Sequence, residues 1–327
     1  MNKLVYPVEP YNQFALRDCY FSMVFPIVKH FGGSVDTLAV ATNNDISFVF
    51  ENGRLRQIDS RKSRENLNEY LVEQGISMRH DESYHENIIE FVCDSLDKED
   101  LVVVSLSDAI SYDPKTGNKT GSHGGYSHWI LFYGYDKENK VFNVIDHFSV
   151  ESPIYCKLLM NFDEIKRSYD EHEKNFGSKL QLFSNIHETL STDEIKAKYL
   201  MEWKRSRNEN SIADYLSFLE DFFKSDFQKF RRYRFFVAED IVHLSVYYLQ
   251  QKFVLTVLGA DKAIIKLIDR QNASILAIKQ KLFDLREVKT NEDFAKYISG
   301  FEFSEQFIEN GKEIEGFING ITAKKEE

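Results

Sequence analysis

A pair of apolar runs in the middle of the chain constrains the fold more than any other feature. The run from Ser127 to Tyr135 is followed by the polar residues 136–140 and by a second apolar run from Val141 to Asp146. Two such runs joined by a short polar turn are typical of an antiparallel β-hairpin. Because the turn lies midway, His128 near the start of the first strand and Asp146 at the end of the second are predicted to meet on one face.

A helix is predicted near the N-terminus, with Cys19 in its first turn. Asp18 is a favourable N-cap residue, the apolar run from Tyr20 to Val28 supplies a buried face, and Gly32-Gly33 ends the helix. The N-terminus of a helix stabilises negative charge, which favours the reactive thiolate form of a cysteine. Pro26 lies too deep for a first-turn proline, so we expect a kink or a local break there.

Together these residues have the types needed for acyl transfer through a thiol. Cys19 is the predicted nucleophile, His128 its base and Asp146 the group that orients the base. Gln13 can donate its side-chain amide to the oxyanion beside the Cys19 backbone N–H, although Asn12 could do the same. We therefore predict these four residues to be catalytic: Cys19, His128, Asp146 and Gln13. Four neighbours are predicted to bind substrate: Tyr20, Ser127, Trp129 and Gly125.

The arrangement of these residues resembles a known superfamily. The Gln-x4-Asp-Cys motif of residues 13–19, followed by His128 and a hairpin ending in Asp146, is similar to the papain-fold peptidases that remove bacteriocin leader peptides. The stretch from Asp18-Cys19 to Phe31-Gly32-Gly33-Ser34, with Ser127-His128-Trp129 and Gly134-Tyr135-Asp136, is more closely similar to the N-terminal domain of the butirosin-type acyltransferases. The likeness extends to the papain-like enzymes of polythioamide (closthioamide) assembly, and it covers roughly residues 8–160.

This resemblance implies an α+β, papain-like fold, in which a helix carrying the cysteine packs on an antiparallel sheet carrying the histidine and the aspartate. It implies an acyltransferase that moves an acyl or peptidyl group from a carrier-protein thioester, through a Cys19 acyl-enzyme, to an amine such as a diamine. Such reactions form amides in antibiotic and nonribosomal-peptide biosynthesis. The substrate would be carried on the phosphopantetheine of the carrier protein, and no cofactor is expected.

Two other functions remain open. A cysteine peptidase or amidase would use the same residues and hand the acyl group to water instead of an amine. A catalytically silent binding protein would keep the papain-like fold without the activity. Two departures from the peptidases count against the first alternative: His147 stands where a proline commonly follows the aspartate, and the bulky Tyr20 follows the nucleophile.

A metal site is a competing interpretation of the same residues. His123, His128, Asp146 and His147 offer imidazole and carboxylate ligands. Paired H-x-x-x-H or C-x-x-C spacing is absent, and neighbours on a strand should point Asp146 and His147 to opposite faces. We therefore predict no metal. The Gly-rich segment 121–125 lacks the ending of a phosphate-binding loop and is predicted to be a mobile lip over the site.

Composition and charge limit the expected partners and the expected cellular location. The formal net charge of -11 argues against general nucleic-acid binding and favours a cationic acceptor such as an amine. No signal pattern or apolar span of bilayer length is visible, so we expect no membrane partner. The three cysteines have no paired spacing, which favours a reducing cytoplasm. Cys93 and Cys156 lack polar surroundings like those of Cys19 and are interpreted as buried side chains.

The sequence pattern changes near residue 160. Strands and helices alternate before it and helical periodicity dominates after it, which predicts a catalytic domain over 1–185 and a helical domain over 186–327. The helical half is either a structural extension or a lid and docking surface. Four basic residues among phenylalanines are candidates for docking the acidic helix and phosphate of a carrier protein, with a solvated helix face as the alternative: Lys229, Arg231, Arg232 and Arg234.

Two strands and two helices are also predicted from local patterns. The β-branched residues of 37–41 predict a strand, and 46–50 predict another. Helices are predicted over 212–233 and 238–258, with Gly259 and Gly300 as breaks.

Overall fold

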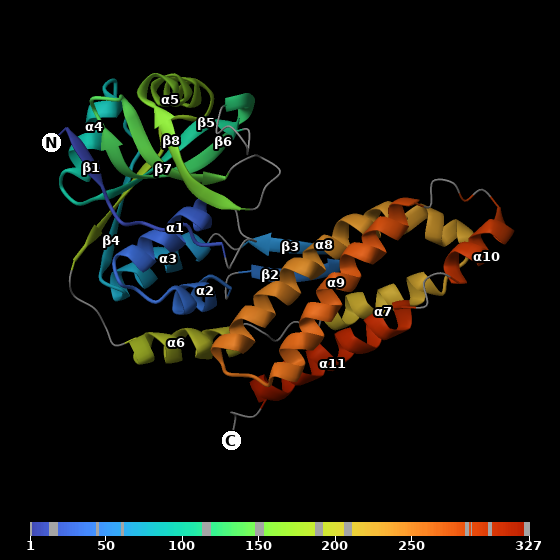
Figure 1. Cartoon of the computed structure of the whole chain (residues 1–327). Helices are drawn as coiled ribbons and strands as arrows, with labels where there is room; N and C mark the ends of the chain where they lie inside the picture. Colours follow the sequence, from blue (N-terminus) through green and yellow to red (C-terminus); the bar gives the residue numbers. More distant parts are fainter. Residues whose placement is uncertain are drawn as a thin grey trace. The chain divides into compact units, whose positions relative to one another are not determined.

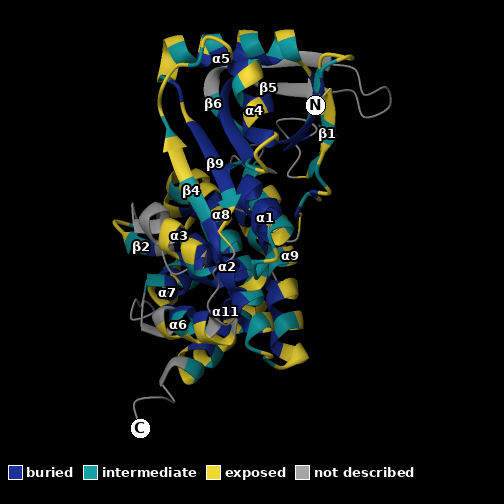
Figure 2. Ribbon diagram, turned by 90° about the vertical axis from the view of Figure 1, so that its left-hand side faces the viewer, coloured by how far each residue is buried: buried dark blue, intermediate teal, exposed yellow. Residues whose placement is uncertain are grey.

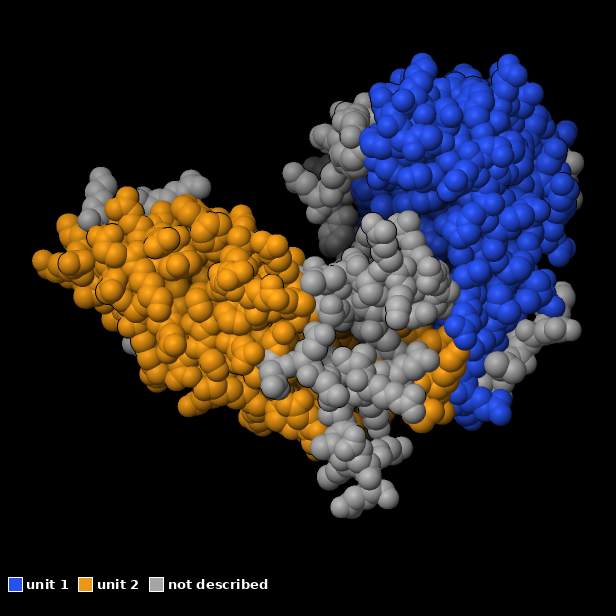
Figure 3. All heavy atoms as spheres, turned by 180° about the vertical axis from the view of Figure 1, so that it is seen from behind, with its two compact units in different colours: residues 1–38, 67–195 blue, residues 39–66, 196–327 orange. Residues whose placement is uncertain are grey.

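The computed structural model describes residues 2–12, 19–43, 46–59, 62–112, 119–147, 154–186, 192–205, 211–284, 288, 290–299 and 303–323. These residues form an α+β structure in which the described strands all precede residue 186 and the C-terminal part is helical (Figure 1). The chain divides into two compact units, residues 1–38 with 67–195 and residues 39–66 with 196–327 (Figure 3). It passes between the units within helix α2 (Val35–Asn43) and returns within α3 (Lys62–Glu73).

An antiparallel sheet forms the body of the first unit. Its strands run in the order β4-β9-β5-β6-β7-β8, and β1 also pairs with β6. The strands are β1 (Lys3–Val5), β4 (Ile76–Asp81), β5 (Leu101–Tyr112), β6 (Lys119–Asp136), β7 (Val141–His147), β8 (Tyr155–Asn161) and β9 (Leu180–Asn185). The predicted hairpin is β6 and β7, and β9 returns to this sheet beside β5.

Three helices pack on this sheet. Helix α1 (Cys19–His30) lies against β6, α4 (Ile88–Leu96) against β5 and β6, and α5 (Phe162–Phe176) against β5. Every residue of α1 from 20 to 28 is buried, so this helix has almost no polar face, whereas α5 carries exposed residues along its outer side (Figure 2). Helix α1 begins at Cys19 and ends before Gly32, whose φ of 83° suits a glycine after a helix, as predicted. The helix continues through Pro26 without a break.

The hairpin contains an irregularity that only glycine can occupy. The register of β6 and β7 shifts between Phe132 and Gly134, which is a β-bulge. At Gly134 a Cβ atom would lie 2.6 Å from the carbonyl oxygen of Leu4 and 2.8 Å from the Cα of Val5. Strand β1 can therefore pair closely with β6 only because residue 134 has no side chain.

Most of the helices belong to the second unit. They are most of α6 (Thr192–Arg205), with α7 (Ser211–Phe223), α8 (Phe227–Val257), α9 (Lys262–Asp284), α10 (Asn291–Ser299) and α11 (Phe303–Ala323). Helix α8 packs along α9, and α11 packs on α7 and α9. Gly259, with a φ of 71°, follows α8 as a predicted break, while Gly300 lies outside the described residues.

A two-stranded hairpin of β2 (Ile46–Glu51) and β3 (Arg54–Asp59) completes the second unit. Its turn residues Asn52 and Gly53 both have positive φ values, 53° and 75°, which is the two-residue turn that suits the twist of a hairpin. The hairpin packs on α7 and α8, with the ring of Phe48 5.2 Å from that of Tyr247. A segment predicted to lie in the N-terminal domain therefore forms part of the second unit. The predicted domain boundary at residue 185 stays a prediction.

Several local predictions were wrong. Residues 37–41 are helical, in α2, because the Ser34 hydroxyl accepts a hydrogen bond from the Thr37 N–H and so caps a helix over these residues. The two predicted helices over 212–258 are broken at 224–226, where Asp226 caps α8 by accepting from the Lys229 N–H, and not at 234–237. The Gly-rich segment 121–125 was predicted to be a lip, but its residues pair with β5 in β6.

Candidate active site

Cys19 is the first residue of helix α1. Its residue is partly exposed, while the next nine residues of the helix are buried, so the thiol lies at the boundary between the core and the surface. The N–H groups of the first helical turn have no partners within the helix, and the helix dipole places positive charge at this end. The position therefore offers stabilisation both to a thiolate and to an oxyanion that forms beside it.

The hairpin brings His128 and Asp146 together as predicted. In the register of β6 and β7, Leu131 pairs with Ile145, so continuing the register places Asp146 opposite Ile130. His128 lies two residues further along β6, which makes it a diagonal neighbour of Asp146 on the same face. The His128 Nε2 is 2.6 Å from the Asp146 Oδ1, and both residues are buried, with 3% and 0% exposure.

The electrostatics of this pair favour a charged imidazole. Burial alone lowers the pKa of His128, but the charge and hydrogen bond of Asp146, together with a hydrogen bond to the Cys19 side chain, outweigh burial and raise the pKa to about 10. Because Nε2 is bonded to Asp146, the other ring nitrogen, Nδ1, is left to face Cys19. Three residues from two distant parts of the chain thus form one continuous polar chain of thiol, imidazole and carboxylate.

His147 belongs to the same cluster, which contradicts the expectation that Asp146 and His147 point apart. The His147 Nδ1 is 3.3 Å from the Asp146 Oδ1, and the His147 backbone N–H donates to that oxygen at 2.6 Å. The ring of His147 meets that of His128 edge to face at 4.4 Å. Burial lowers the pKa of His147, and although Asp146 raises it, the charge of His128 lowers it further. Asp146 and His147 are the last two residues of β7, and both still pair with β8, opposite Cys156 and Tyr155.

The predicted substrate-binding residues fall into two groups. The rings of Tyr20 and Trp129 lie 5.4 Å apart, beside the candidate nucleophile and base in the sequence. The Ser127 hydroxyl instead bonds the Ser105 hydroxyl at 2.6 Å and the His172 Nε2 at 3.0 Å, in a buried network with α5. Ser127 therefore supports the sheet next to His128, and its hydroxyl is already hydrogen-bonded within the protein.

Other predicted residues lie partly or wholly outside the described structure. Gln13 and Asp18 are not among the described residues. Gly125 lies in β6, but its surroundings are not described, and the same holds for the side chain of His123. The oxyanion role of Gln13 and the capping role of Asp18 therefore stay predictions.

The four basic residues of α8 do not lie on one face. Successive residues of a helix are about 100° apart, so Lys229 lies near Arg232 and Arg231 near Arg234, on two different sides. Lys229, Arg231 and Arg232 are exposed, and the guanidinium of Arg234 lies over the ring of Phe235 at 4.4 Å. A carrier protein that docked here would contact one pair or the other, and the docking role stays a prediction.

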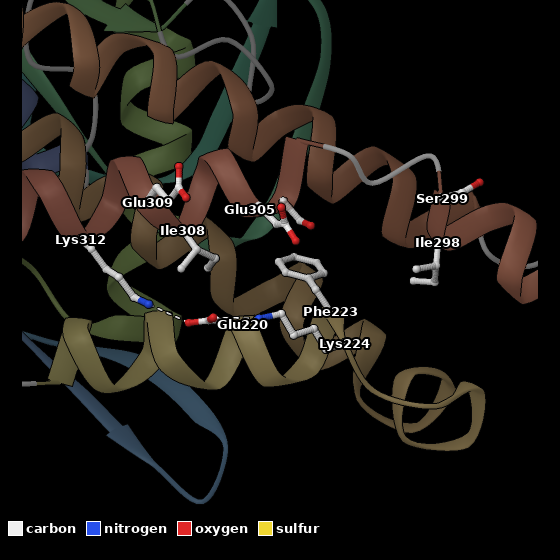
Figure 4. Close-up of a pocket in the computed structure, with 10 residues that line it drawn as sticks. Glu220, Phe223, Lys224, Ile298, Ser299, Glu305, Ile308, Glu309 and Lys312 are labelled. Atoms are coloured by element: carbon white, nitrogen blue, oxygen red, sulfur yellow. Dashed lines mark hydrogen bonds and ion pairs between the residues drawn. The ribbon is translucent and has the colours of Figure 1, made fainter.

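The second unit contains a cavity of about 880 Å³ between α7, α10 and α11. Figure 4 shows Glu220 between Lys224 and Lys312, with nitrogen-to-oxygen distances of 2.9 and 2.7 Å, and these two cations lower the pKa of Glu220 to about 2. No cysteine or histidine is found among the described residues that line it: Glu220, Phe223, Lys224, Ile298, Ser299, Ser304, Glu305, Ile308, Glu309 and Lys312. The described lining of this cavity therefore offers no thiol or imidazole, whereas the candidate residues Cys19, His128 and Asp146 belong to the first unit.

Comparison with known proteins did not identify a family for this chain. A scan against protein-family models found no match, and a search of the curated proteins found none either. Among the helices that the structure describes, none is both long and apolar enough to cross a bilayer.

Proposed function

We propose that this protein is a papain-like cysteine acyltransferase, which moves an acyl or peptidyl group from a carrier-protein thioester to an amine and so forms an amide in the biosynthesis of an antibiotic or another secondary metabolite. The observation that carries the proposal is the contact of the buried pair His128 and Asp146 with the partly exposed Cys19. The 2.6 Å contact between His128 and Asp146 fixes the ring, and the raised pKa keeps the ring charged beside the thiol.

The first half of the reaction forms an acyl-enzyme. The Cys19 thiolate attacks the thioester carbonyl, and the resulting oxyanion is held by the Cys19 backbone N–H and by Gln13. The carbon–sulfur bond to the carrier then breaks, and His128 gives its proton to the departing thiolate. One thioester replaces another, so this step is nearly balanced in free energy.

The second half transfers the acyl group. The amine attacks the acyl-enzyme, and the now neutral His128 takes the amine's proton. The carbon–sulfur bond to Cys19 breaks, the amide is released, and the thiolate and imidazolium are restored. Asp146 holds the ring through both halves, because its hydrogen bond fixes the nitrogen that faces the sulfur.

Amine transfer is favoured over hydrolysis by two observations. The bulky Tyr20 directly follows the nucleophile in the sequence and packs against Trp129, which adds apolar bulk next to Cys19. The net charge of -11 favours the approach of a cationic diamine. Both observations concern the group that accepts the acyl group. They favour transfer to an amine over hydrolysis, and they do not affect the formation of the acyl-enzyme.

Intact-mass spectrometry after exposure to acyl thioesters of a small thiol tests the proposal. We expect an adduct of one acyl group on Cys19 that a diamine discharges as the amide. Discharge as the free acid in the presence of the diamine would instead assign a peptidase or amidase. The absence of any adduct, with Cys19 no more reactive toward iodoacetamide than Cys93, would assign a silent binding protein, because burial raises the pKa of Cys93 to about 12.

A further inference from the structure

We propose that His128, Asp146 and His147 form a Zn²⁺ site, and that zinc bound there inhibits the acyl transfer. The inhibition rests on the proposed function, whereas the binding of zinc does not. The proposal starts from the unexpected position of His147, which turns a two-residue contact into a three-residue cluster at the end of β7.

The three residues can offer ligand atoms to one ion. One ring nitrogen from each histidine and one oxygen of Asp146 all lie within 4.8 Å of one another. Ligands at about 2.0–2.1 Å from a tetrahedral zinc ion are roughly 3.3 Å apart, so small side-chain movements suffice to gather them. The 2.6 Å contact between His128 and Asp146 has to open by less than about 1 Å to admit the ion.

Two of the ligand residues have a polar atom without a partner. Among the described residues, nothing hydrogen-bonds the Asp146 Oδ2 or the His147 Nε2. Asp146 has no exposed surface and His147 is 8% exposed, so neither atom is open to bulk water. Buried polar atoms normally have a hydrogen-bond partner. A histidine nitrogen and a carboxylate oxygen that both lack one in the same cluster can bind the same ion.

The donor set selects zinc over the common alkaline-earth ions. Two imidazole nitrogens and one carboxylate oxygen match a three-ligand zinc site with an open fourth position. Calcium needs six to eight oxygen ligands, and magnesium needs a regular octahedron of oxygens and water, which a buried pair of imidazoles does not provide. Imidazole and carboxylate ligands also suit iron, nickel and copper ions, and zinc is the one proposed here because it forms such three-ligand sites without redox chemistry.

Zinc at this site would stop the proposed chemistry directly. The ion displaces the proton from the His128 nitrogen that it binds, and that proton is released to solvent. The hydrogen bond between His128 and Asp146 is replaced by two bonds to the metal. The ring is then neutral and keeps its last proton on Nδ1, which a metal-bound imidazole gives up far less readily than an imidazolium does. His128 therefore neither protonates a departing thiolate nor takes a proton from an amine, and free zinc would hold the enzyme inactive until it is chelated.

Binding is measured first in the Cys19→Ser protein, so that neither the nucleophile nor catalysis contributes. The protein is titrated with Zn²⁺ in competition with a chromophoric chelator. We expect one zinc ion per chain, and His147→Asn in the same background is expected to weaken binding by at least about tenfold, because a ligand is lost. The matched control is His85→Asn, since His85 also contacts an aspartate, the 3.0 Å partner Asp81, but at the surface.

The proposal is overturned if the His147→Asn and His85→Asn proteins bind zinc equally well. Should His147→Asn fail to fold, X-ray absorption at the zinc edge of the Cys19→Ser protein decides. We expect two imidazoles in the first shell with oxygen completing it, and a shell with one imidazole or none would contradict the proposal.

The inhibitory effect is measured separately, as acyl-adduct formation by the wild-type chain in buffered Zn²⁺. We expect adduct formation to fall with rising zinc and to return on adding a chelator, with the half-inhibiting concentration matching the measured Kd. If zinc binds without inhibiting adduct formation, the proposed inhibition is wrong but the proposed zinc site stands. If no adduct forms in the absence of zinc, the proposed function fails, while the binding measurement still decides the metal site.

Discussion

The two units each bury an aspartate against a cation, and the two are satisfied in different ways. Asp240 in α8 receives four hydrogen bonds spread over both oxygens, three from the Arg54 guanidinium and one from the Leu55 N–H, at 2.8–3.0 Å. Asp146 receives its contacts from His128 and His147 at Oδ1 alone, while Oδ2 has no partner among the described residues.

This difference separates a structural carboxylate from a reactive one. A fully bonded buried carboxylate has no capacity left and can only hold its partners in place, as Asp240 holds the β2–β3 hairpin on α8. A carboxylate with one free oxygen can change partners when charge moves nearby. Saturation of hydrogen bonds, more than burial, therefore distinguishes the two, because both aspartates are 1% exposed or less.

The largest expected effect comes from removing the nucleophile. Cys19→Ala should abolish the acyl adduct and lower turnover by about 10⁴-fold or more, because Cys19 is the thiol that contacts His128. The measurement is intact mass together with amide formation. Cys93→Ala is the control, since that buried thiol should contribute nothing, and full activity in the Cys19→Ala protein would refute the mechanism.

Asp146→Asn tests the reactive carboxylate. It should lower turnover by about 10³- to 10⁴-fold, because an amide cannot support the charged form of His128 and can select the wrong tautomer. Binding of the thioester should change much less, so the loss is expected in kcat and not in KM. A loss confined to KM would mean that Asp146 holds substrate and does not orient the ring.

Asp240→Asn tests the structural carboxylate. Removing one partner of a buried ion pair costs about 3–5 kcal/mol, and we expect the lower end because the Arg54 side chain is 27% exposed. The free energy of unfolding is measured by urea denaturation in a Trp129→Phe background, where Trp203 in the second unit is the remaining tryptophan. An unchanged midpoint would show that the pair carries no stability.

The smallest effect is a difference in pH dependence. The pKa of His128 is raised from 6.5 to about 10 on folding, so its stabilisation is complete below pH 6.5, declines as the pH rises and is gone above pH 10. Thermal denaturation of the wild type should therefore lose more stability between pH 6.5 and 10 than that of His128→Gln. Parallel curves for the two proteins would mean that His128 is not charged in the folded protein.

The residue pattern predicted the elements whose signals are local. Helix α1 was predicted from its apolar run and terminal glycines, and the β6–β7 hairpin from two apolar runs around a polar turn. Because register follows from such a hairpin, the approach of His128 to Asp146 was predictable too. The meeting of these two with Cys19 could be inferred only from the chemistry that the three residue types share, since the pattern contains no distance between them.

The rest depended on contacts that the pattern does not contain. Residues 37–41, which include the β-branched Thr37 and Val40, were predicted to form a strand, but the Thr37 N–H donates to the Ser34 hydroxyl and caps a helix over them. The Asn52-Gly53 pair was a readable signal for the β2–β3 hairpin that we did not use. That the hairpin belongs with α8 rests on Arg54 and Asp240, which are 186 residues apart, a separation that no periodicity bridges. His147 was excluded by assuming strand alternation at the point where β7 ends.

The early position of that hairpin has a consequence for how the chain matures. During synthesis β2 and β3 leave the ribosome long before α8, and at about 5–20 residues per second the Arg54 side chain waits roughly 10–40 s for Asp240. Throughout that time Phe48 and Leu55, both buried in the finished protein, have no helical partner to cover them. A fragment that ended before residue 196 would keep this exposed apolar hairpin permanently, so we expect it to aggregate, and the nascent chain would need a chaperone over the same interval.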